Sequence, residues 1–260
     1  VYLGTYVGSS SQGWRFDSMG RNCGLIGPGA AVVFANAAFW ISPDRQFWTM
    51  PLGGAPIPID CPIREDFADN LSASQADKIV ASSIGEFGEV RWDYPDARDG
   101  IENSRYIVLQ VSGSDAGAWS RGVQARTAMV DAGPSLYPCG VTYDGNIYWH
   151  ERGTSADGGA MSGYIQTADM YLDPNVTAMI RGVWPDFESQ VGPTYVTIET
   201  RFKPQGDVTT KGPYTMAVGD DKVDVRTKGR LANVKISSSS APSEWRLGRI
   251  MLDVVQTGQR

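Results

Sequence analysis

Three carboxylates lie close together in the sequence, at Glu86, Glu89 and Asp93. Residues 88–94 predict a strand, so Glu89, Arg91 and Asp93 would share one face. Two carboxyl groups about 5 to 9 Å apart can hydrolyse a glycosidic bond. The carboxylates are therefore the candidate catalytic residues for a propeller glycosidase or a depolymerase of surface polysaccharide.

The other residue types that carry chemistry form no catalytic pattern. His150 is the single histidine of the sequence, and no G-x-S-x-G motif accompanies it, which favours a hydrogen-bonded structural histidine. No cluster of histidine, cysteine or carboxylate residues has metal-ligand spacing. The glycine-rich segment 24–29 has Pro28 where a phosphate-binding loop needs a backbone amide. We therefore predict no catalytic residues, no cofactor and no metal ligands, which describes a protein that is not an enzyme.

Composition limits the compartment and the partners. Cys23, Cys61 and Cys139 are an odd number of widely spaced cysteines, which predicts buried free thiols in a reducing compartment rather than disulfides. The formal net charge of -6 argues against tight, sequence-specific binding of nucleic acid, because phosphate neutralisation needs clustered cations. The sequence has no run of about 18 apolar residues, so no membrane-spanning segment is expected.

Basic residues near the C-terminus could form a nucleic-acid patch. Acidic residues are interleaved with them, so cross-strand ion pairs or a subunit interface are favoured over that patch. The basic residues are Arg226, Lys228, Arg230, Lys235, Arg246 and Arg249, and the acidic ones are Asp221, Asp224, Glu244 and Asp253.

The elements that would position these side chains are short strands. The sequence of 260 residues holds 30 glycines, 15 prolines, 8 Trp, 11 Tyr and 8 Phe, a composition that favours strands and turns over helices. Residues 30–42 and 46–52 predict a hairpin, and residues 66–77 predict a short helical turn. Residues 56–61 are rich in proline, so they predict either an edge strand or an extended loop. Further strands are predicted at residues 78–83, 88–94, 104–112, 118–121 and 124–131, and a last hairpin at 140–143 and 146–150.

Tryptophans recur at the ends of these strands, at Trp40, Trp48, Trp92, Trp119 and Trp149, with turns every eight to twelve residues or so. The pattern predicts a β-propeller-like region over residues 1–151. At about 40 to 45 residues per blade this region supplies about three blades, so the remaining blades would lie upstream of Val1.

Two strings resemble the aspartate-box turn of sialidase-type propellers. Residues 142–149 contain Thr142, Asp144 and Trp149, with Gly145 one place early. Residues 42–48 contain Asp44 but lack the glycine and are one residue short. Such turns are structural and lie away from active sites, so they support the fold rather than an activity.

A polar, glycine-rich linker is predicted at residues 152–159, followed by a C-terminal antiparallel β-sandwich over residues 160–260. The apolar alternation changes phase after Gly229 and again at Gly248. An extra residue in a strand would restore the core-facing side chains, so both glycines predict β-bulges with a positive φ.

The order of several short strings is similar to one known family. The sequence resembles the tail nozzle or hub proteins of short-tailed bacteriophages, the packaged-DNA stabilisation family, over residues 34–260. The strings in the first half are residues 89–95, 102–108, 119–122, 126–128, Asp144-Gly145 with Tyr148, and 150–153. Those in the second half are Pro185-Asp186, Thr200-Arg201, 212–214, 222–226, Gly229-Arg230, 245–248, 252–254 and 258–260. Asp93 and Trp149 depart from the family pattern.

The resemblance implies a structural protein of the virion tail, assembled in the cytoplasm of a bacterial host. Such a protein forms a ring of identical subunits, expected to be a hexamer, which contacts portal and adaptor proteins and anchors tail fibres or spikes. The ring retains packaged double-stranded DNA and lets it leave through the lumen without sequence-specific binding. An acidic wall suits that role, because it repels phosphate. Ring contacts are heterologous, so a single subunit should expose apolar interface patches. A sugar-binding module is a third interpretation, after the ring subunit and the glycosidase.

Overall fold

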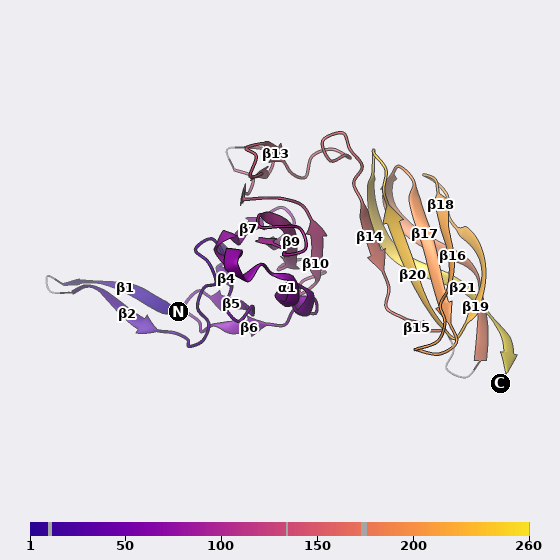
Figure 1. Cartoon of the computed structure of the whole chain (residues 1–260), viewed down its shortest axis with the longest axis horizontal. Helices are drawn as coiled ribbons and strands as arrows, with labels where there is room; N and C mark the ends of the chain where they lie inside the picture. The colour runs from indigo at the N-terminus through magenta and orange to yellow at the C-terminus, as the bar shows by residue number, and fades with distance from the viewer. Residues whose placement is uncertain (10–11, 134, 173–175, 260) are drawn as a thin grey trace. The chain divides into compact units, whose positions relative to one another are not determined.

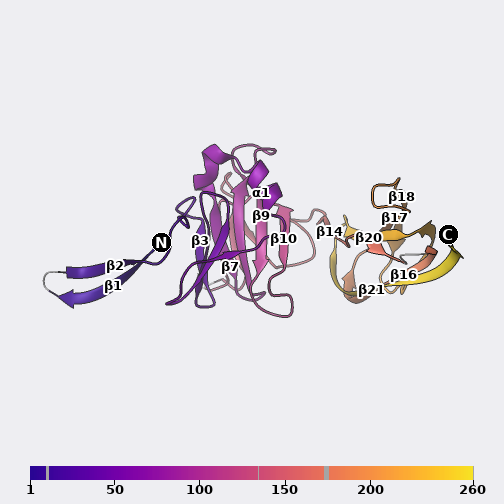
Figure 2. The same ribbon diagram turned by 90° about the horizontal axis from the view of Figure 1, so that it is seen from below.

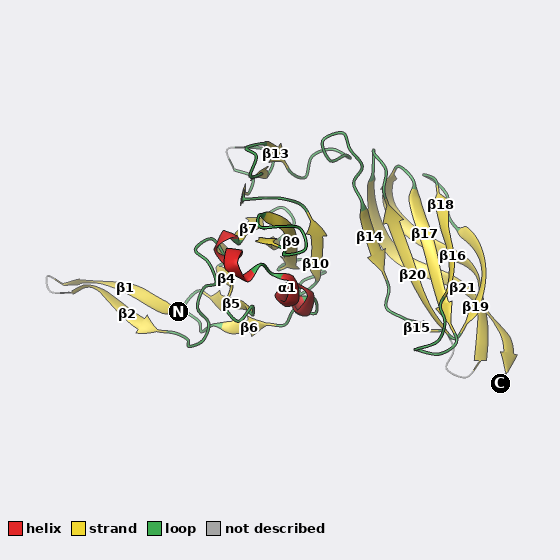
Figure 3. Cartoon of the chain, viewed as in Figure 1, coloured by secondary structure: helices red, strands yellow, loops and turns green. Residues whose placement is uncertain are grey.

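The computed structural model describes residues 1–9, 12–133, 135–172 and 176–259. Strands make up 54% of the structure and helices 5%, so the all-β prediction is confirmed (Figure 3). The chain forms two compact units, Val1–Arg152 and Gly153–Arg260, called unit 1 and unit 2 below.

Unit 1 contains four antiparallel sheets in chain order (Figures 1 and 2). A hairpin of two strands comes first, then two sheets of four strands and one of three, each an up-and-down meander. The hairpin consists of β1 (Tyr2–Ser9) and β2 (Gln12–Ser18), and the first four-stranded sheet of β3 (Ala31–Phe34), β4 (Ala37–Ile41), β5 (Phe47–Pro51) and β6 (Ile57–Ile59). The second contains β7 (Val80–Ile84), β8 (Glu89–Pro95), β9 (Asn103–Gln110) and β10 (Trp119–Val123), and the third β11 (Ala128–Val130), β12 (Cys139–Val141) and β13 (Ile147–Trp149).

The apolar core of unit 1 holds side chains from both four-stranded sheets and from the helix α1 (Arg64–Asn70). The Phe47 ring of β5 lies 5.1 Å from the Trp92 ring of β8 and 5.5 Å from the Phe67 ring of α1, measured between centroids. The Trp92 indole also donates a hydrogen bond of 3.2 Å to the carbonyl of Ala30. These contacts fix β8 firmly against the first sheet.

The structure changes some predicted element bounds in unit 1. The run at residues 30–42 is two strands, β3 and β4, because Ala35 and Asn36 form a turn with φ of 48° and 61°. Asparagine adopts the left-handed conformation readily but alanine does not, so the sequence gives little sign of this turn. The helical turn predicted at 66–77 is two short helices, α1 and the 3-10 helix η1 (Ala73–Lys78). The proline-rich segment forms an edge strand, β6, rather than an extended loop.

Unit 2 consists of two antiparallel sheets that share one apolar core, which contains Ile180, Val225, Ile198 and Val234 (Figure 1). One sheet has the order β14-β20-β17-β18, with β15 also paired to β20, and the other has the order β19-β16-β21. The bounds are β14 (Gly163–Gln166), β15 (Met170–Tyr171), β16 (Val176–Val191), β17 (Thr194–Arg201), β18 (Thr209–Met216), β19 (Val223–Gly229), β20 (Leu231–Ser238) and β21 (Glu244–Gln259).

The two glycines predicted as bulges have different roles. At Gly229 the prediction is wrong, because the chain leaves β19 in one sheet and enters β20 in the other, so the phase shift marks a change of sheet. A Cβ at Gly229 would lie 2.9 Å from the Cβ of Thr200, which explains why the crossing needs glycine. Gly248 does lie at a bulge, since two residues of β21 stand opposite one residue of β16 there. Neither glycine has the predicted positive φ.

Other sequence predictions can be compared with the described residues directly. Cys23 and Cys61 are buried free thiols as predicted, and burial raises the pKa of the Cys61 thiol to about 11, whereas Cys139 is a free thiol that is only half-buried. Within the residues the structure describes, no helix is both long and apolar enough to cross a membrane.

Candidate functional site

Strand β8 presents different chemistry on its two faces. Val90, Trp92 and Tyr94 point into the apolar core of unit 1. Arg91 and Asp93 point the other way, yet they are only 5% and 1% exposed. A charged pair on the second face of a strand therefore lies as deep as the apolar core on the first.

Arg91 and Asp93 form a buried ion pair. The Arg91 Nη2 atom lies 2.6 Å from Asp93 Oδ1, and Arg91 Nε donates to both carboxylate oxygens at 3.2 and 3.1 Å. Arg91 Nη2 also donates to Oε1 of Gln124 at 2.9 Å, and its guanidinium lies 4.0 Å from the centroid of the Tyr106 ring. The Tyr106 ring packs over its cross-strand neighbour Gly122, where a Cβ would overlap the phenol. Arg91 is thus held on several sides at once.

A second buried pair continues from the first. Arg126 Nε donates a hydrogen bond of 2.7 Å to Nε2 of His150, and the Arg126 guanidinium lies 4.8 Å from the Tyr148 ring centroid. Both side chains lie over Gly140, where a Cβ would be 2.6 Å from Arg126 Cδ and 2.7 Å from His150 Nε2. The Asn103 side-chain amide also donates a hydrogen bond of 3.0 Å to the Arg126 carbonyl, which connects the segment around Arg126 to β9. We call Arg91, Asp93, Tyr106, Arg126 and His150 the buried polar cluster.

The charges of the cluster determine its protonation. Burial, together with the positive charges of Arg126 and Arg91, lowers the pKa of His150 to about 4. His150 is therefore neutral at pH 7, which agrees with its Nε2 accepting a hydrogen bond. Burial also raises the pKa of the Asp93 carboxyl, while the charge and hydrogen bonds of Arg91 oppose that change. A histidine that faces two arginines is suited to structure and poorly suited to accepting a proton.

The structure does not bring the three predicted carboxylates together as a catalytic set. Asp93 is buried and paired with Arg91, so no substrate can reach it. Glu86 is exposed, and Glu89 is half-buried at the edge of the cluster. Burial raises the pKa of Glu89, and the negative charge of Glu151 adds to the rise. Glu151 is thus the carboxylate that acts on Glu89. Sequence spacing could not indicate this, because Glu89 begins β8 and Glu151 lies in the loop that follows β13.

No metal site accompanies the cluster. Among the residues described, no group of three or more histidine, cysteine or carboxylate side chains could hold a metal ion. The sequence singles out His150 and places Arg91 on the strand face of Asp93, but it does not connect Arg126 with them. Nothing in the spacing of residues 91, 126 and 150 indicates that they meet. The nearest signal is Gly140, whose lack of a side chain leaves room for Arg126 and His150.

The two strings that resemble aspartate boxes adopt the same turn. In the first, the Ser42 hydroxyl donates to the Asp44 carboxylate, and in the second the Thr142 hydroxyl donates to that of Asp144. The backbone matches as well, with Ser42 N–H bonded to the Gln46 carbonyl at 2.9 Å and Thr142 N–H to that of Asn146 at 3.0 Å. The left-handed position is Arg45 in one turn and Gly145 in the other, with φ of 63° and 88°. The first string therefore forms the turn without the glycine.

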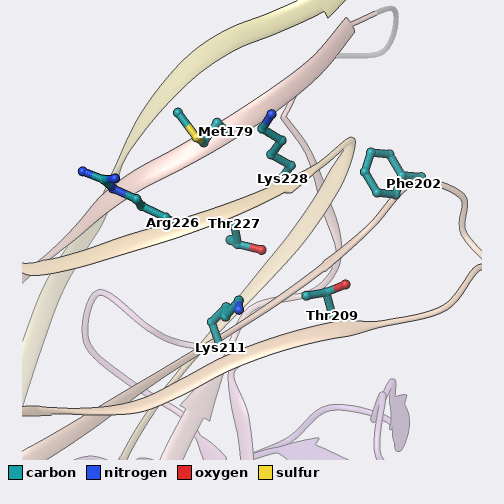
Figure 4. Close-up of a pocket in the computed structure, with 7 residues that line it drawn as sticks. All are labelled: Met179, Phe202, Thr209, Lys211, Arg226, Thr227 and Lys228. Carbon is teal, nitrogen blue, oxygen red and sulfur yellow. The ribbon is translucent and has the colours of Figure 1, made fainter.

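The basic residues of unit 2 do not form a converging patch. Arg246 lies 3.6 Å from Glu188 across β16 and β21, as predicted for a cross-strand pair, and the Lys235 ammonium lies 4.4 Å from the Tyr164 ring centroid. Arg226 and Lys228 line a cavity of about 410 Å³ together with Thr227. Strand alternation separates them, and Figure 4 shows the charged ends of Arg226 and Lys228 directed away from Thr227. Lys211 also lines this cavity, so three of its seven lining residues are cationic, although the charged ends of Arg226 and Lys228 point away from Thr227.

Comparison with known proteins gives no assignment: no protein-family model matches the chain, and no curated protein is significantly similar to it.

Proposed function

We propose that this chain is a structural virion protein, a subunit of the tail nozzle ring of a short-tailed bacteriophage. The observation that carries the proposal is the place of the residues on which the family resemblance rests. Arg91, Tyr106, Gly122, Arg126 and His150 come from five separate strings of the sequence, and they meet in or against the buried polar cluster. Residues that hold a scaffold together are the ones that structural proteins of one family would be expected to share, and these five residues have that role here.

The chemistry of the cluster suits a rigid wall better than a catalyst. Asp93 offsets the charge of Arg91, while Arg126 keeps its positive charge and donates a hydrogen bond to the neutral His150. Removing either member of a buried pair is costly, so the cluster fixes the geometry of the strands around it. The net charge of -6 fits a channel from which DNA slides, because phosphate is repelled.

We further propose that the sheets of unit 1 are propeller-like blades and that unit 2 is a β-sandwich. Support for the blades comes from the up-and-down order of the two four-stranded sheets and from the repeated aspartate turn. In this proposal six subunits form the ring. They contact portal and adaptor proteins on one side and tail fibres or spikes on the other, and DNA passes through the lumen.

The test compares virions assembled with and without this chain. We expect particles that lack the protein to fill with DNA and then lose it, measured as DNA per particle after nuclease treatment. Supplying the chain in trans should restore full particles. Particles that keep their DNA and still eject it normally without this chain would overturn the proposal.

A glycosidase or polysaccharide depolymerase is the second candidate. One observation favours it: the pKa of Glu89 is raised by burial and by Glu151, as expected for a general acid beside a second carboxylate. The test is turnover of sialosides or capsular polysaccharide by the pure protein. The ring proposal expects none. Turnover that disappears in Glu89→Gln and persists in the control Glu188→Gln, which changes an exposed residue of unit 2, would establish the enzyme instead.

A further inference from the structure

The hairpin β1–β2 has one face that is almost entirely aromatic. Cross-strand pairing places Gly4 opposite Phe16 and Tyr6 opposite Trp14, with Tyr2 on the same side. We call Tyr2, Tyr6, Trp14 and Phe16 the aromatic face. The other side of the hairpin carries Thr5, Arg15 and Asp17 together with Leu3 and Val7, and Arg15 Nε lies 2.9 Å from Asp17 Oδ2.

No residue that the structure describes covers the aromatic face. Tyr2, Tyr6, Trp14 and Phe16 are 69%, 68%, 59% and 67% exposed. Strand β1 pairs with β2 alone, and no residue of the hairpin belongs to either apolar core. Soluble proteins seldom leave a contiguous aromatic surface in water unless it is an interaction site.

The aromatic side chains are ordered against one another. The Phe16 ring packs over Gly4, where a Cβ would lie 3.1 Å from Phe16 Cε1, and the Tyr6 and Trp14 rings meet edge-on with centroids 5.5 Å apart. Aromatic cover of a cross-strand glycine stabilises a hairpin. A hairpin of two strands is nevertheless marginally stable alone in water, so burial of this face would stabilise it further.

The aromatic face is large enough to anchor a subunit contact. A buried aromatic residue contributes about 150 to 250 Å², so four rings at this exposure offer about 400 to 600 Å². A stable interface of standard size needs about 800 Å² from each partner. The hairpin would therefore supply about half to three quarters of one side. Tyrosine and tryptophan are among the residues that dominate interface energies.

Unit 1 also contains an apolar surface of a different shape. In the sheet β11–β13, cross-strand pairing places Val130, Cys139 and Trp149 on one face, together with Val141 and Ile147. Val130, Ile147 and Trp149 are 61%, 71% and 55% exposed. The opposite face of the sheet, with Gly140 and Tyr148, covers the buried polar cluster. We call Val130, Cys139, Val141, Ile147 and Trp149 the outer face of β11–β13.

We propose that the aromatic face of one copy binds the outer face of β11–β13 on the next copy. The two surfaces differ, so the contact is heterologous, and a heterologous contact repeated around an axis closes a ring. The proposal rests on the ring function proposed above and names the surfaces that join its subunits. A second copy is preferred to another partner because each chain carries both exposed apolar surfaces, the aromatic face and the outer face of β11–β13.

Two variants of the full chain test the donor surface. Trp14→Ser with Phe16→Ser removes half of the aromatic face, whereas the control, Arg15→Ser with Asp17→Ser, changes the same strand on its other face. We expect wild type and control to form the same closed oligomer by light scattering. The oligomer of the Trp14→Ser/Phe16→Ser variant should dissociate at a concentration about 100-fold higher than the wild-type oligomer does, since two interface aromatics are lost. Near-ultraviolet circular dichroism checks that the cores stay folded.

Cross-linking tests the acceptor surface without disturbing the hairpin. Benzoylphenylalanine replaces Tyr6 and, as the control, Thr5 on the opposite face. In a mixture of isotope-labelled and unlabelled chains, the probe at position 6 should react with a peptide from residues 128–149 of another copy. The probe at position 5 should not.

The outcomes separate this inference from the function it rests on. A ring that persists in Trp14→Ser/Phe16→Ser, or a cross-link to another peptide, overturns the inference and leaves the ring function intact. A wild-type chain that is monomeric at every concentration overturns both. A variant that keeps its ring but loses binding to polysaccharide beads or lipid vesicles shows that the aromatic face serves such a partner, which also overturns the inference.

Discussion

The two aspartate turns have the same hydrogen bonds but lie in different surroundings. After the first turn, Phe47 is fully buried in the apolar core of unit 1. After the second, Ile147 occupies the equivalent place and is 71% exposed, while its neighbour Tyr148 lies against Arg126. The first turn thus joins strands that bury apolar side chains. The second joins strands that cover Arg126 and His150 with one face and expose apolar side chains on the other.

This difference shows that the turn determines the path of the backbone but not which face is buried. The face is determined by what packs against the sheet. For β5 the neighbour is another apolar sheet, and for β13 it is the buried polar cluster. A sheet that covers buried polar groups with one face and exposes apolar side chains on the other is suited to a contact on its exposed face. In the proposed ring a neighbouring subunit would make that contact.

The largest expected effect on stability comes from replacing by alanine the equivalent apolar residues that follow the two turns. Phe47→Ala should lower the free energy of unfolding by about 3 to 5 kcal/mol, because it leaves a cavity among the rings of Phe67, Trp92 and Trp119. Ile147→Ala should change it by no more than about 0.5 kcal/mol when the chain is dilute. Urea unfolding followed by tryptophan fluorescence measures both. Equal losses at the two positions would show that the turns have the same surroundings after all.

Acid should lower the stability of the region around the second turn, because His150 is buried there in its neutral form. Its pKa is about 4 in the folded chain and 6.5 ordinarily, so stability is fully present above pH 6.5 and is lost as the pH falls toward 4. The loss from this residue amounts to about 3 kcal/mol. His150→Gln offers an acceptor for Arg126 and does not titrate, so its stability should fall less over that range, as measured by urea unfolding at several pH values. Parallel pH profiles for wild type and His150→Gln would contradict the buried, neutral histidine.

A methyl group at Gly140 should disrupt the same region by crowding. In Gly140→Ala the new Cβ meets Arg126 and His150 at 2.6 to 2.7 Å, so their hydrogen bond must lengthen or break. The expected cost is about 1 to 3 kcal/mol, as for other overpacked interiors. Gly133→Ala is the matched control, because a Cβ there meets nothing within 4 Å. The account fails here if the two variants are equally stable by thermal unfolding.

The smallest effect separates the turns themselves. Ser42 is fully buried, and its hydroxyl also accepts a 2.8 Å hydrogen bond from the Trp48 indole, so Ser42→Ala should cost about 1 to 3 kcal/mol. Thr142 is less buried, so Thr142→Ala should cost about 0.5 to 1 kcal/mol. Chemical denaturation of both variants gives the comparison. A larger loss of stability for Thr142→Ala would mean that burial does not determine how much the turn hydroxyl contributes to the free energy of unfolding.

Local patterns explain which features the sequence could predict. The strand around Trp92 and the Asp144-Gly145 turn depend on neighbouring residues, and both are confirmed. The turn at Ala35 escaped prediction because its left-handed alanine is stabilised by the strands on either side. Gly229 was misassigned because a change of sheet and a bulge both shift the apolar phase by one residue.

The candidate site was predicted only in part for a similar reason. Asp93 and His150 stand out by residue type, and Arg91 shares a strand face with Asp93. Arg126 is identified only by its hydrogen bond to His150, 24 positions away, and by its charge interaction with Asp93, 33 positions away. Periodicity carries no information about such contacts. The aromatic face of β1–β2 was missed as well, because a hairpin with no core of its own has no burial pattern to follow.

The most direct test of the central claim is the mass of the assembly formed by the pure chain, measured by native mass spectrometry and viewed by electron microscopy. The account predicts a single closed oligomer, expected to be a hexamer, with an open lumen along its axis. A monomer that persists up to high concentration would contradict it.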